Sequence, residues 1–474
     1  MKNNTIEELD NLFRLQKEAF ARDRNPGLDA RLSRLRALEA MMVDLRQKLR
    51  DSISDDFGTH NPWITDIFET GGVLGRNRHI QAKLADWLAP SDRPLVPEAH
   101  GSSRCEVVKL PKGVMGNIAP WNFPIECSLV MVNEMLAAGN RVIVKLSEFA
   151  PATAAVLQES VGDYFDQSVL AVVAGDLPLS QHFASLPWDH LTYTGNTSVG
   201  RLVMQAAAAN LTPVTLELGG KNPTIFLEDG VNEQRILEYL SFKFCKNGQI
   251  CTSPDYALVP EAMLEEWVET AERVWRRAYP TYLGHPDNTG IINERHFDRL
   301  LSMLEEASDA GARVIAMSDE GPDRTTRQMP MYLVVQPDEA LRVMREETFG
   351  PITPVITYRS LDEAIDYINS RDRPLASYLV SDERVPEKLE RFKTAVLSGG
   401  AGINVFGFQA AEPGAPFGGV GASGMGCHAG IEGFDGYVHH KTVFDCADDN
   451  PVKASIMLPY DGVTEAVANA VFGG

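Results

Sequence analysis

The sequence predicts an α/β protein with two regions of parallel β-sheet and a separate extended arm. From residue 114 onward, apolar strand-like runs alternate with helix-like segments, which is typical of right-handed βαβ units. A second set of strand-like runs begins after Gly219 and Gly220. With 474 residues, the chain is long enough for two or three domain-sized units. We therefore expect two Rossmann-like sheets and a small β arm.

The individual elements follow in chain order. Residues 6–50 are predicted to be helical because leucines recur at spacings of three and four, and Pro26 with Gly27 divides them into two helices. Residues 94–112 are predicted to form the extended arm, since the strand-like run 104–110 is framed by turn residues. The later predictions are strands 114–118, 141–146, 169–175, 190–195, 223–227 and 351–356, helices 151–163 and 198–209, and a glycine-rich loop at 416–426.

The composition excludes several classes of protein. Hydrophobic residues make up 44% and charged residues 23% of the chain, an ordinary globular balance. The net charge of −21 argues against nucleic-acid binding, which depends on basic residues. No apolar run reaches the roughly 18 residues of a membrane span, and the first residues contain no apolar h-region, so we expect no signal peptide. Six scattered cysteines favour neither a disulfide framework nor a metal site. We expect a cytoplasmic protein.

Cys251 is the first candidate for chemistry. It lies between Gly248 and Pro254, in a stretch predicted to be a constrained loop or helix entry. A lone cysteine is more often a buried packing residue than a nucleophile. Backbone N–H groups in such a loop can nevertheless lower the pKa of a thiol, and a thiolate attacks carbonyl carbons. Considered alone, Cys251 leaves both interpretations open.

Glu217 and Asn122 are ambiguous in the same way. Glu217 lies between two leucines, where apolar neighbours raise the pKa of a carboxyl and suit it to general-base catalysis. A structural glutamate with a hydrogen-bond partner is the more ordinary interpretation. Gly219 and Gly220, which follow, would let another group approach the backbone closely. Asn122 lies between two prolines after a predicted strand, either as a turn former or as a donor to an oxyanion.

Four segments together resemble the signature motifs of the aldehyde dehydrogenase superfamily, in the family's order. They are residues 120–124 (PWNFP), 216–221 (LELGGK), 248–251 (GQIC) and 346–351 (EETFGP). The resemblance covers nearly the whole chain. Residues 193–195, 253–256, 290–293 with 295–297, and 373–376 are further similar to the branch of fatty- and aromatic-aldehyde dehydrogenases. Within that branch, residues 54–58, 210–218 and 416–426 are similar to bacterial coniferyl-aldehyde dehydrogenases.

The resemblance implies NAD(P)-dependent oxidation of an aldehyde to a free carboxylic acid. Cys251 would form a thiohemiacetal and then a thioester, Asn122 would stabilise the oxyanion, and Glu217 would activate the hydrolytic water. The substrate is expected to be an aromatic aldehyde such as coniferyl aldehyde, or a medium- or long-chain aliphatic aldehyde. The alternatives are a thiol esterase and a non-enzymatic descendant of the same fold.

The resemblance also places the cofactor against residues 195–200 (GNTSVG), where a strand enters a helix whose N-terminus suits a pyrophosphate. No GxGxxG motif is present. Glu148 would accept from ribose hydroxyls and repel a 2′-phosphate, which favours NAD, while Lys145 leaves NADP open. The residues assigned to the cofactor are Trp121, Lys145, Glu148, Gly195, Asn196, Gly200, Leu218, Glu347 and Phe349.

The same resemblance divides the chain. It assigns residues 1–93 and 113–217 to a cofactor-binding domain, 218–415 to a catalytic domain, and 94–112 with 427–474 to an oligomerisation arm and C-terminal tail. A homodimer or homotetramer is therefore expected.

Three positions depart from the family. Asn196 replaces the usual serine, Leu146 replaces the usual proline, and residues 426–430 (GCHAG) stand where the branch commonly has a Tyr-His pair before the glycine. Cys427 is expected to be a packing residue. The candidate residues for the walls of a substrate pocket are Phe123, Glu126, Phe244 and Phe406.

Overall fold

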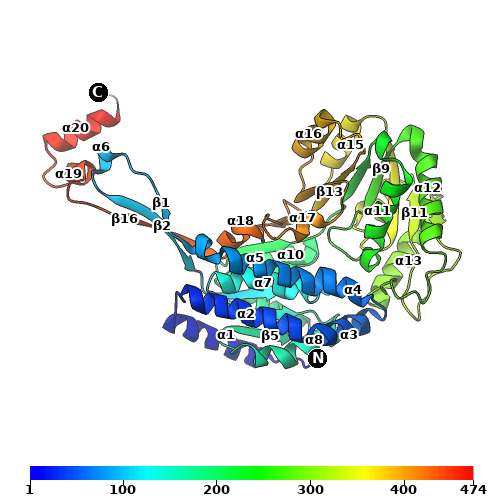
Figure 1. The fold of residues 1–474 in the computed structure, drawn as a ribbon, viewed down its shortest axis with the longest axis horizontal. Helices are drawn as coiled ribbons and strands as arrows, with labels where there is room; N and C mark the ends of the chain where they lie inside the picture. The colour runs from blue at the N-terminus through cyan, green and yellow to red at the C-terminus, as the bar shows by residue number, and fades with distance from the viewer. Residues whose placement is uncertain (473–474) are drawn as a thin grey trace.

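The computed structural model describes residues 1–472, which form two α/β bodies and a projecting arm (Figure 1). One body contains a six-stranded sheet, the other a seven-stranded sheet, and the arm a three-stranded sheet. This arrangement confirms the predicted fold class of two Rossmann-like sheets with a small β arm.

The six-stranded sheet has the order β15-β7-β6-β3-β4-β5. Its strands are β3 (Val114–Ile118), β4 (Arg141–Leu146), β5 (Leu170–Ala174), β6 (His190–Thr194), β7 (Val214–Glu217) and β15 (Gly424–Met425). All neighbours are parallel except β15, which pairs antiparallel with β7. The chain runs outward from β3 to β5 and then returns to the other side of β3. Ligands of open α/β sheets bind outside the carboxyl ends of the strands at such a reversal.

Both faces of this sheet are covered by helices. Val142 and Val144 belong to one hydrophobic core and Ile143 to the opposite one, because successive side chains of a strand point to opposite faces. The first face carries α2 (Leu28–Asp44), α3 (Arg46–Phe57), α5 (Gly71–Leu88), α7 (Glu126–Ala137) and α8 (Pro151–Ser160). The second carries α1 (Ile6–Arg22), α9 (Leu177–Ser185) and α10 (Thr197–Ala208).

The N-terminal helical region differs from the prediction in one respect. The predicted break at Pro26 and Gly27 is present, but a second break at Leu45, with ψ of −2°, separates α2 from α3. Leu45 is an apolar residue that continues the leucine pattern, so the pattern gave no indication of this break.

The seven-stranded sheet has the order β10-β11-β12-β9-β8-β13-β14. Its strands are β8 (Pro223–Phe226), β9 (Tyr256–Pro260), β10 (Arg313–Ala316), β11 (Tyr332–Val335), β12 (Ile352–Tyr358), β13 (Ala376–Val380) and β14 (Gly400–Ile403). The helices of this body are α11 (Glu233–Phe244), α12 (Leu264–Ala278), α13 (Glu294–Asp309), α14 (Arg342–Arg345), α15 (Leu361–Asn369), α16 (Pro386–Ala395) and α17 (Phe408–Ala411). Only β10 is antiparallel to its neighbour.

The arm joins residues from both ends of the chain. Its strands β1 (Ser91–Asp92), β2 (Arg104–Pro111) and β16 (Val438–Asp445) are antiparallel. The short helix α6 (Pro97–His100), α19 (Pro451–Ser455) and α20 (Gly462–Val471) lie at its tip (Figure 1). The exact domain limits proposed from the sequence stay predictions.

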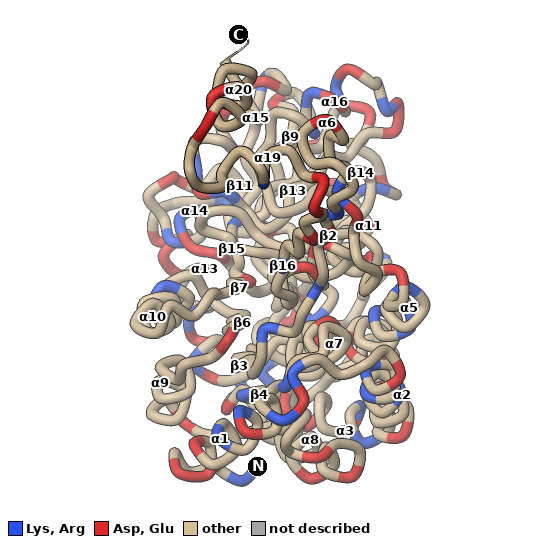
Figure 2. Tube along the Cα trace, turned by 90° about the vertical axis from the view of Figure 1, so that its left-hand side faces the viewer, with Lys and Arg blue, Asp and Glu red and all other residues tan. Residues whose placement is uncertain are grey.

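Acidic and basic residues are interspersed along the outer helices (Figure 2). Within residues 1–472, no helix is long and apolar enough to cross a membrane, and no group of His, Cys, Asp or Glu side chains is placed to hold a metal ion. All six cysteines are free thiols.

Candidate active site

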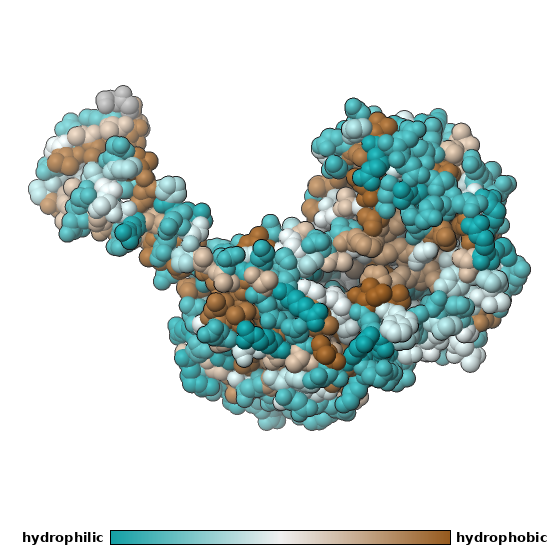
Figure 3. Space-filling model, in the orientation of Figure 1, coloured by the Kyte–Doolittle hydropathy of each residue, from teal (hydrophilic) through white to brown (hydrophobic). Residues whose placement is uncertain are grey.

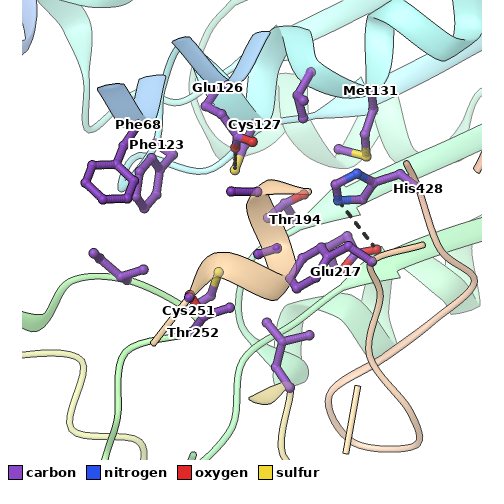
Figure 4. A pocket seen from close by; sticks show the side chains of 18 of the residues that line it. Phe68, Phe123, Glu126, Cys127, Met131, Thr194, Glu217, Cys251, Thr252 and His428 are labelled. Atoms are coloured by element: carbon purple, nitrogen blue, oxygen red, sulfur yellow. Dashed lines mark hydrogen bonds and ion pairs between the residues drawn. The ribbon is translucent and has the colours of Figure 1, made fainter. Parts of the chain in front are cut away.

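Two cavities meet between the two bodies of the molecule. The first, here called the apolar cavity, is walled by residues that include Phe68, Phe123, Val130, Met131, Phe242 and Phe417 (Figure 4). The second, the sheet-edge cavity, lies at the carboxyl ends of β3, β6 and β7. Thr194, Glu217, Leu218 and Cys251 line both cavities. Hydrophobic residues are visible in the hollow between the two bodies (Figure 3).

Cys251 follows a tight turn, Cys245–Gly248, at the end of α11, in which Lys246 and Asn247 have left-handed backbone angles with φ of 49° and 54°. Gly248 has a φ of +76°, and a Cβ there would lie 2.3 Å from the carbonyl oxygen of Gly350. Only glycine fits such a position. The predicted constraint on this loop is therefore confirmed, and its cause is close contact with the segment that follows Glu347.

The electrostatic surroundings of Cys251 shift the pKa of its thiol in opposite directions. The N–H of Thr252 bonds to the sulfur and lowers the pKa of the thiol, as expected of backbone donors. Burial has the larger effect, and it acts with the nearby carboxyl groups of Glu347, Glu126 and Glu217 to raise the pKa of the thiol above its ordinary value. Desolvation therefore outweighs the lowering that backbone donors can cause in such a loop.

Glu217 ends strand β7 opposite Thr194 of β6 and is 4% exposed. Neither of its carboxylate oxygens has a hydrogen-bond partner among residues 1–472. Burial raises the pKa of Glu217 well above its ordinary value, although Arg76 acts in the opposite direction. This confirms the effect expected from the apolar neighbours. The carboxyl group faces the space shared by the two cavities (Figure 4).

Asn122 follows β3 and reaches the loop that holds Cys251. Its Nδ2 donates to the carbonyl oxygen of Gln249 at 3.1 Å. Its own carbonyl oxygen accepts from Lys246 Nζ at 2.5 Å. Lys246 also pairs with Glu69 at 2.5 Å, and both of these side chains are 0% exposed. The loop is thus held by a buried ion pair that the sequence analysis did not identify.

The Lys246–Glu69 pair also reaches α7. Glu69 belongs to a π-helix, Thr65–Thr70, and its Oε2 accepts from the backbone N–H groups of Ile125 and Glu126, each at 3.0 Å. One carboxylate therefore caps the start of α7 while it neutralises Lys246. The sequence does not indicate this pair, because the partner of Lys246 is 177 residues away in the chain.

Comparison with known proteins agrees with this geometry. Residues 1–443 match the model of the aldehyde dehydrogenase family. A coniferyl aldehyde dehydrogenase of a Pseudomonas strain is 37% identical over 96% of this chain and 94% of its own length. A probable coniferyl aldehyde dehydrogenase of Caulobacter vibrioides is 36% identical over 92% of this chain and 90% of its own. A solved structure described as the substrate-bound state of Staphylococcus aureus AldH superimposes with a TM-score of 0.90, at 31% identity, and covers 99% of this chain and all of the other.

The chain belongs to the aldehyde dehydrogenase family. It is an oxidoreductase that acts on the aldehyde group with a nicotinamide dinucleotide as its cofactor.

The residues of this aldehyde dehydrogenase fit such a cofactor at the sheet-edge cavity. Of the predicted cofactor residues, those that line it are Trp121, Gly195, Asn196, Leu218, Glu347 and Phe349. Lys145 and Glu148 do not line it, but Lys145 lies near the end of β4 and Glu148 just after this strand, at the same edge of the sheet, where their charged groups pair at 2.8 Å. Gly200 lies in α10, and a Cβ there would come 2.8 Å from Leu218. Asn196, which stands where the family usually has serine, caps α10: its side-chain oxygen accepts a hydrogen bond from the N–H of Val199 at 2.9 Å.

Close packing also fixes Glu347. A Cβ on Gly219 would lie 2.3 Å from a carboxylate oxygen of Glu347, which confirms the close approach expected of the glycine pair. Lys221 holds this loop by donating to the carbonyl oxygens of Val343 and Glu346, at 2.9 and 3.0 Å. Burial, reinforced by Asp255, raises the pKa of Glu347 to about 8.

The predicted walls of the substrate pocket are partly wrong. Phe123 and Glu126 line the apolar cavity, but Phe244 and Phe406 do not. Phe244 packs on Trp275 at 5.0 Å, and Phe406 packs on Tyr378 at 5.0 Å, so both complete the core behind the seven-stranded sheet. The cavity walls that the sequence did not indicate include Phe68, Arg76, Phe242 and His428.

The buried ion pair gives a prediction for stability. Replacing Lys246 by methionine (K246M) leaves Glu69 buried without its counter-charge, which costs about 3–5 kcal/mol. Urea denaturation should show this as a large fall in the midpoint. The double variant E69Q/K246M removes both charges and should recover part of the loss. A K246M protein within about 1 kcal/mol of the parent would contradict this role of the pair.

Proposed function

We propose that this aldehyde dehydrogenase oxidises its substrate to the free acid through a thioester on Cys251, with Glu217 as the general base and Asn122 as an oxyanion donor. The observation that supports this most is that Cys251 and Glu217 both line the two cavities at the point where these meet. An aldehyde in the apolar cavity and a cofactor at the sheet edge would then face the same sulfur atom.

The chemistry begins at the sulfur of Cys251. Its thiol proton passes to solvent water, its sulfur forms a bond to the aldehyde carbon, and the carbonyl oxygen becomes an oxyanion. The amide of Asn122 has two N–H groups, of which one donates to Gln249, so the other is left for the oxyanion. When bound, the nicotinamide ring accepts the hydride that leaves this carbon. The oxyanion reforms the carbonyl as the hydride departs, which leaves a thioester on Cys251.

Hydrolysis then requires a base next to the thioester. Glu217 has two unpaired carboxylate oxygens and a raised pKa, which suit it to take a proton from water. The resulting hydroxide equivalent attacks the thioester, the carbon–sulfur bond breaks, and the acid leaves as Cys251 is regenerated. The presence of Glu217 is why we infer a free acid as the product.

For the cofactor, we infer that the start of α10 holds the pyrophosphate and that Glu347 and Phe349 hold the nicotinamide end. Trp121, Gly195, Gly200 and Leu218 would shape the passage between these two regions. Lys145 and Glu148 would bind the adenosine ribose, where the carboxylate favours NAD over NADP.

For the substrate, we infer an aromatic aldehyde of the coniferyl type, with medium- and long-chain aliphatic aldehydes as the second class. The coniferyl aldehyde dehydrogenases among the relatives and the phenylalanine-rich wall of the apolar cavity both favour the aromatic class. Besides Glu217, Glu126 is the carboxyl that lines this cavity, and it lies across the cavity from Cys251 (Figure 4). We propose that the carboxyl group of Glu126 forms a hydrogen bond with the hydroxyl group on the substrate ring.

We further propose a dimer or tetramer in the cytoplasm. The tip of the arm exposes a group of apolar side chains, namely Ile456, Met457, Leu458, Tyr460 and Val463. Apolar patches of this kind are typical of protein–protein contacts. Free thiols at all six cysteines suit a reducing compartment.

The roles of Cys251 and Glu217 predict distinct kinetics. C251A should form no reduced nicotinamide from any aldehyde. E217Q should give a first burst, about one equivalent per active site, and then turn over about 10²–10⁴-fold more slowly, because only hydrolysis is impaired. Stopped-flow absorbance of reduced nicotinamide measures both phases. Normal steady-state turnover by E217Q would show that another group is the base.

The assignment of Glu126 predicts a change of specificity. In E126L, kcat/KM for coniferyl aldehyde should fall about tenfold or more, since a hydrogen bond to a charged or polar partner is lost. The value for cinnamaldehyde, which has no ring hydroxyl, should be unchanged or higher. E126Q keeps the hydrogen-bonding atoms and is the matched control. Equal effects of E126L on both aldehydes would contradict the assignment.

A further inference from the structure

His428 lies between Glu217 and a buried ion pair that the steps above do not use. The segment that departs from the family folds back beside β7, because Phe417 pairs with His428 and Gly424 pairs with Glu217. This hairpin places the imidazole ring of His428 in the wall of the apolar cavity, where it is 5% exposed. Cys427 is only half-buried beside it.

The ion pair consists of Arg76 from α5 and Glu134 from α7. Arg76 Nη1 donates to Glu134 Oε1 at 2.8 Å, and the two side chains are 3% and 0% exposed. The same Nη1 lies 3.0 Å from His428 Nδ1. A guanidinium nitrogen can only donate, so Nδ1 of His428 must be the acceptor and carries no proton.

The other ring nitrogen therefore holds the proton. Burial and the charge of Arg76 keep the pKa of His428 well below its ordinary value, so the ring is neutral near pH 7. A neutral imidazole whose Nδ1 accepts must carry its hydrogen on Nε2. Arg76 thereby fixes the tautomer of His428.

Nε2 of His428 faces Glu217. It lies 4.0 Å from Glu217 Oε1, the contact drawn in Figure 4. This distance is about 1 Å longer than an N–H···O hydrogen bond, so a small rotation of either side chain completes the bond. Hydrogen bonds at active sites are often longer before the substrate is bound.

We propose that His428 is a positioning residue for Glu217, which donates its Nε2–H to the carboxylate and holds it ionised and aligned on the hydrolytic water. This inference rests on the proposed role of Glu217 as the base. Because Nδ1 is engaged by Arg76 and Nε2 already bears hydrogen, His428 has no free lone pair for a proton. Glu217 therefore remains the proton acceptor, and His428 adjusts the pKa and the orientation of the Glu217 carboxylate.

Two amide substitutions separate this role from packing. The Nε2 of glutamine occupies about the position of His428 Nε2, so H428Q retains a donor toward Glu217. The shorter side chain of asparagine ends near the position of Nδ1, so H428N leaves Glu217 without its donor. We expect the burst of reduced nicotinamide to be normal in both variants. Steady-state turnover should fall about tenfold or more in H428N and stay close to the parent in H428Q.

The pH profile supplies a readout that packing alone would not move. A donor to a carboxylate favours its charged form and lowers its pKa. In H428N the rising limb of the deacylation rate should therefore move to higher pH. The other titratable groups around Glu217 and His428 include Arg76, Glu126, Glu134, Cys251, Cys427 and Tyr437. Because burial raises the pKa of Glu126 to about 7, the profiles are best compared in an E126Q background.

A double-mutant cycle tests whether His428 acts through Glu217. In E217Q, adding H428N should cause no further loss of turnover, since the partner of the hydrogen bond is already changed. An additive loss, an unmoved pH limb, equal activities of H428N and H428Q, or parallel losses of burst and turnover would each overturn the proposal. C427A controls for disturbance of the hairpin and should match the parent.

The proposed role of Glu217 as the base can be tested separately from the role of His428. If E217Q turned over normally, the base assignment would be wrong whatever the His428 variants did.

Side-chain nitrogen NMR of the unsubstituted protein adds a measurement that needs no variant to fold. It should detect His428 as the Nε2–H tautomer, and an Nδ1–H signal would overturn the inference.

Discussion

The buried pair of Lys246 and Glu69 is the contact on which the rest of the site depends. It joins a π-helix, the loop of Asn122 and the turn that precedes Cys251, and the free oxygen of Glu69 also caps α7. Each of these segments contributes a wall or a reactive group. Both charges are fully buried, so loss of either partner leaves the other without compensation. The relative positions of Asn122, Glu126 and Cys251 therefore follow from one interaction.

Burial also sets the protonation of the cleft. Three carboxyl groups, Glu126, Glu217 and Glu347, surround Cys251, and burial is the main cause of the raised pKa of each. Glu126 and Glu347, with pKa values of about 7 and about 8, are partly protonated at neutral pH and so repel a thiolate less than carboxylates would. Burial of these carboxyl groups thus makes it easier for the Cys251 sulfur to act as a nucleophile beside them. The His428–Arg76 contact then acts on one of them, Glu217.

Much of this was predictable from the sequence, for identifiable reasons. Strand 141–146 was recognised because its centre, 142–144, is continuously apolar, as expected of a strand covered on both faces. Strand 190–195 was recognised because it combines leucine with threonine and tyrosine, two residue types that are common in strands. The glycines at 219 and 248 indicated close backbone contacts, which exist with Glu347 and Gly350. What the sequence did not reveal depends on partners distant in the chain. Glu69, Arg76 and His428 belong to separate segments, and Phe244 faces the core where a pocket was expected. The hydrophobic pattern of the α11 sequence does not show which face of the helix packs in the core and which lines a cavity.

The most direct test of the central claim is mass analysis of the protein quenched during turnover with an aldehyde and NAD. The account predicts an acyl group on the peptide that contains Cys251, with the mass of the aldehyde less two hydrogens, and predicts that it forms only when NAD is present. An adduct on another cysteine, such as Cys127 in the same cavity, or turnover without any acylated Cys251, would contradict it.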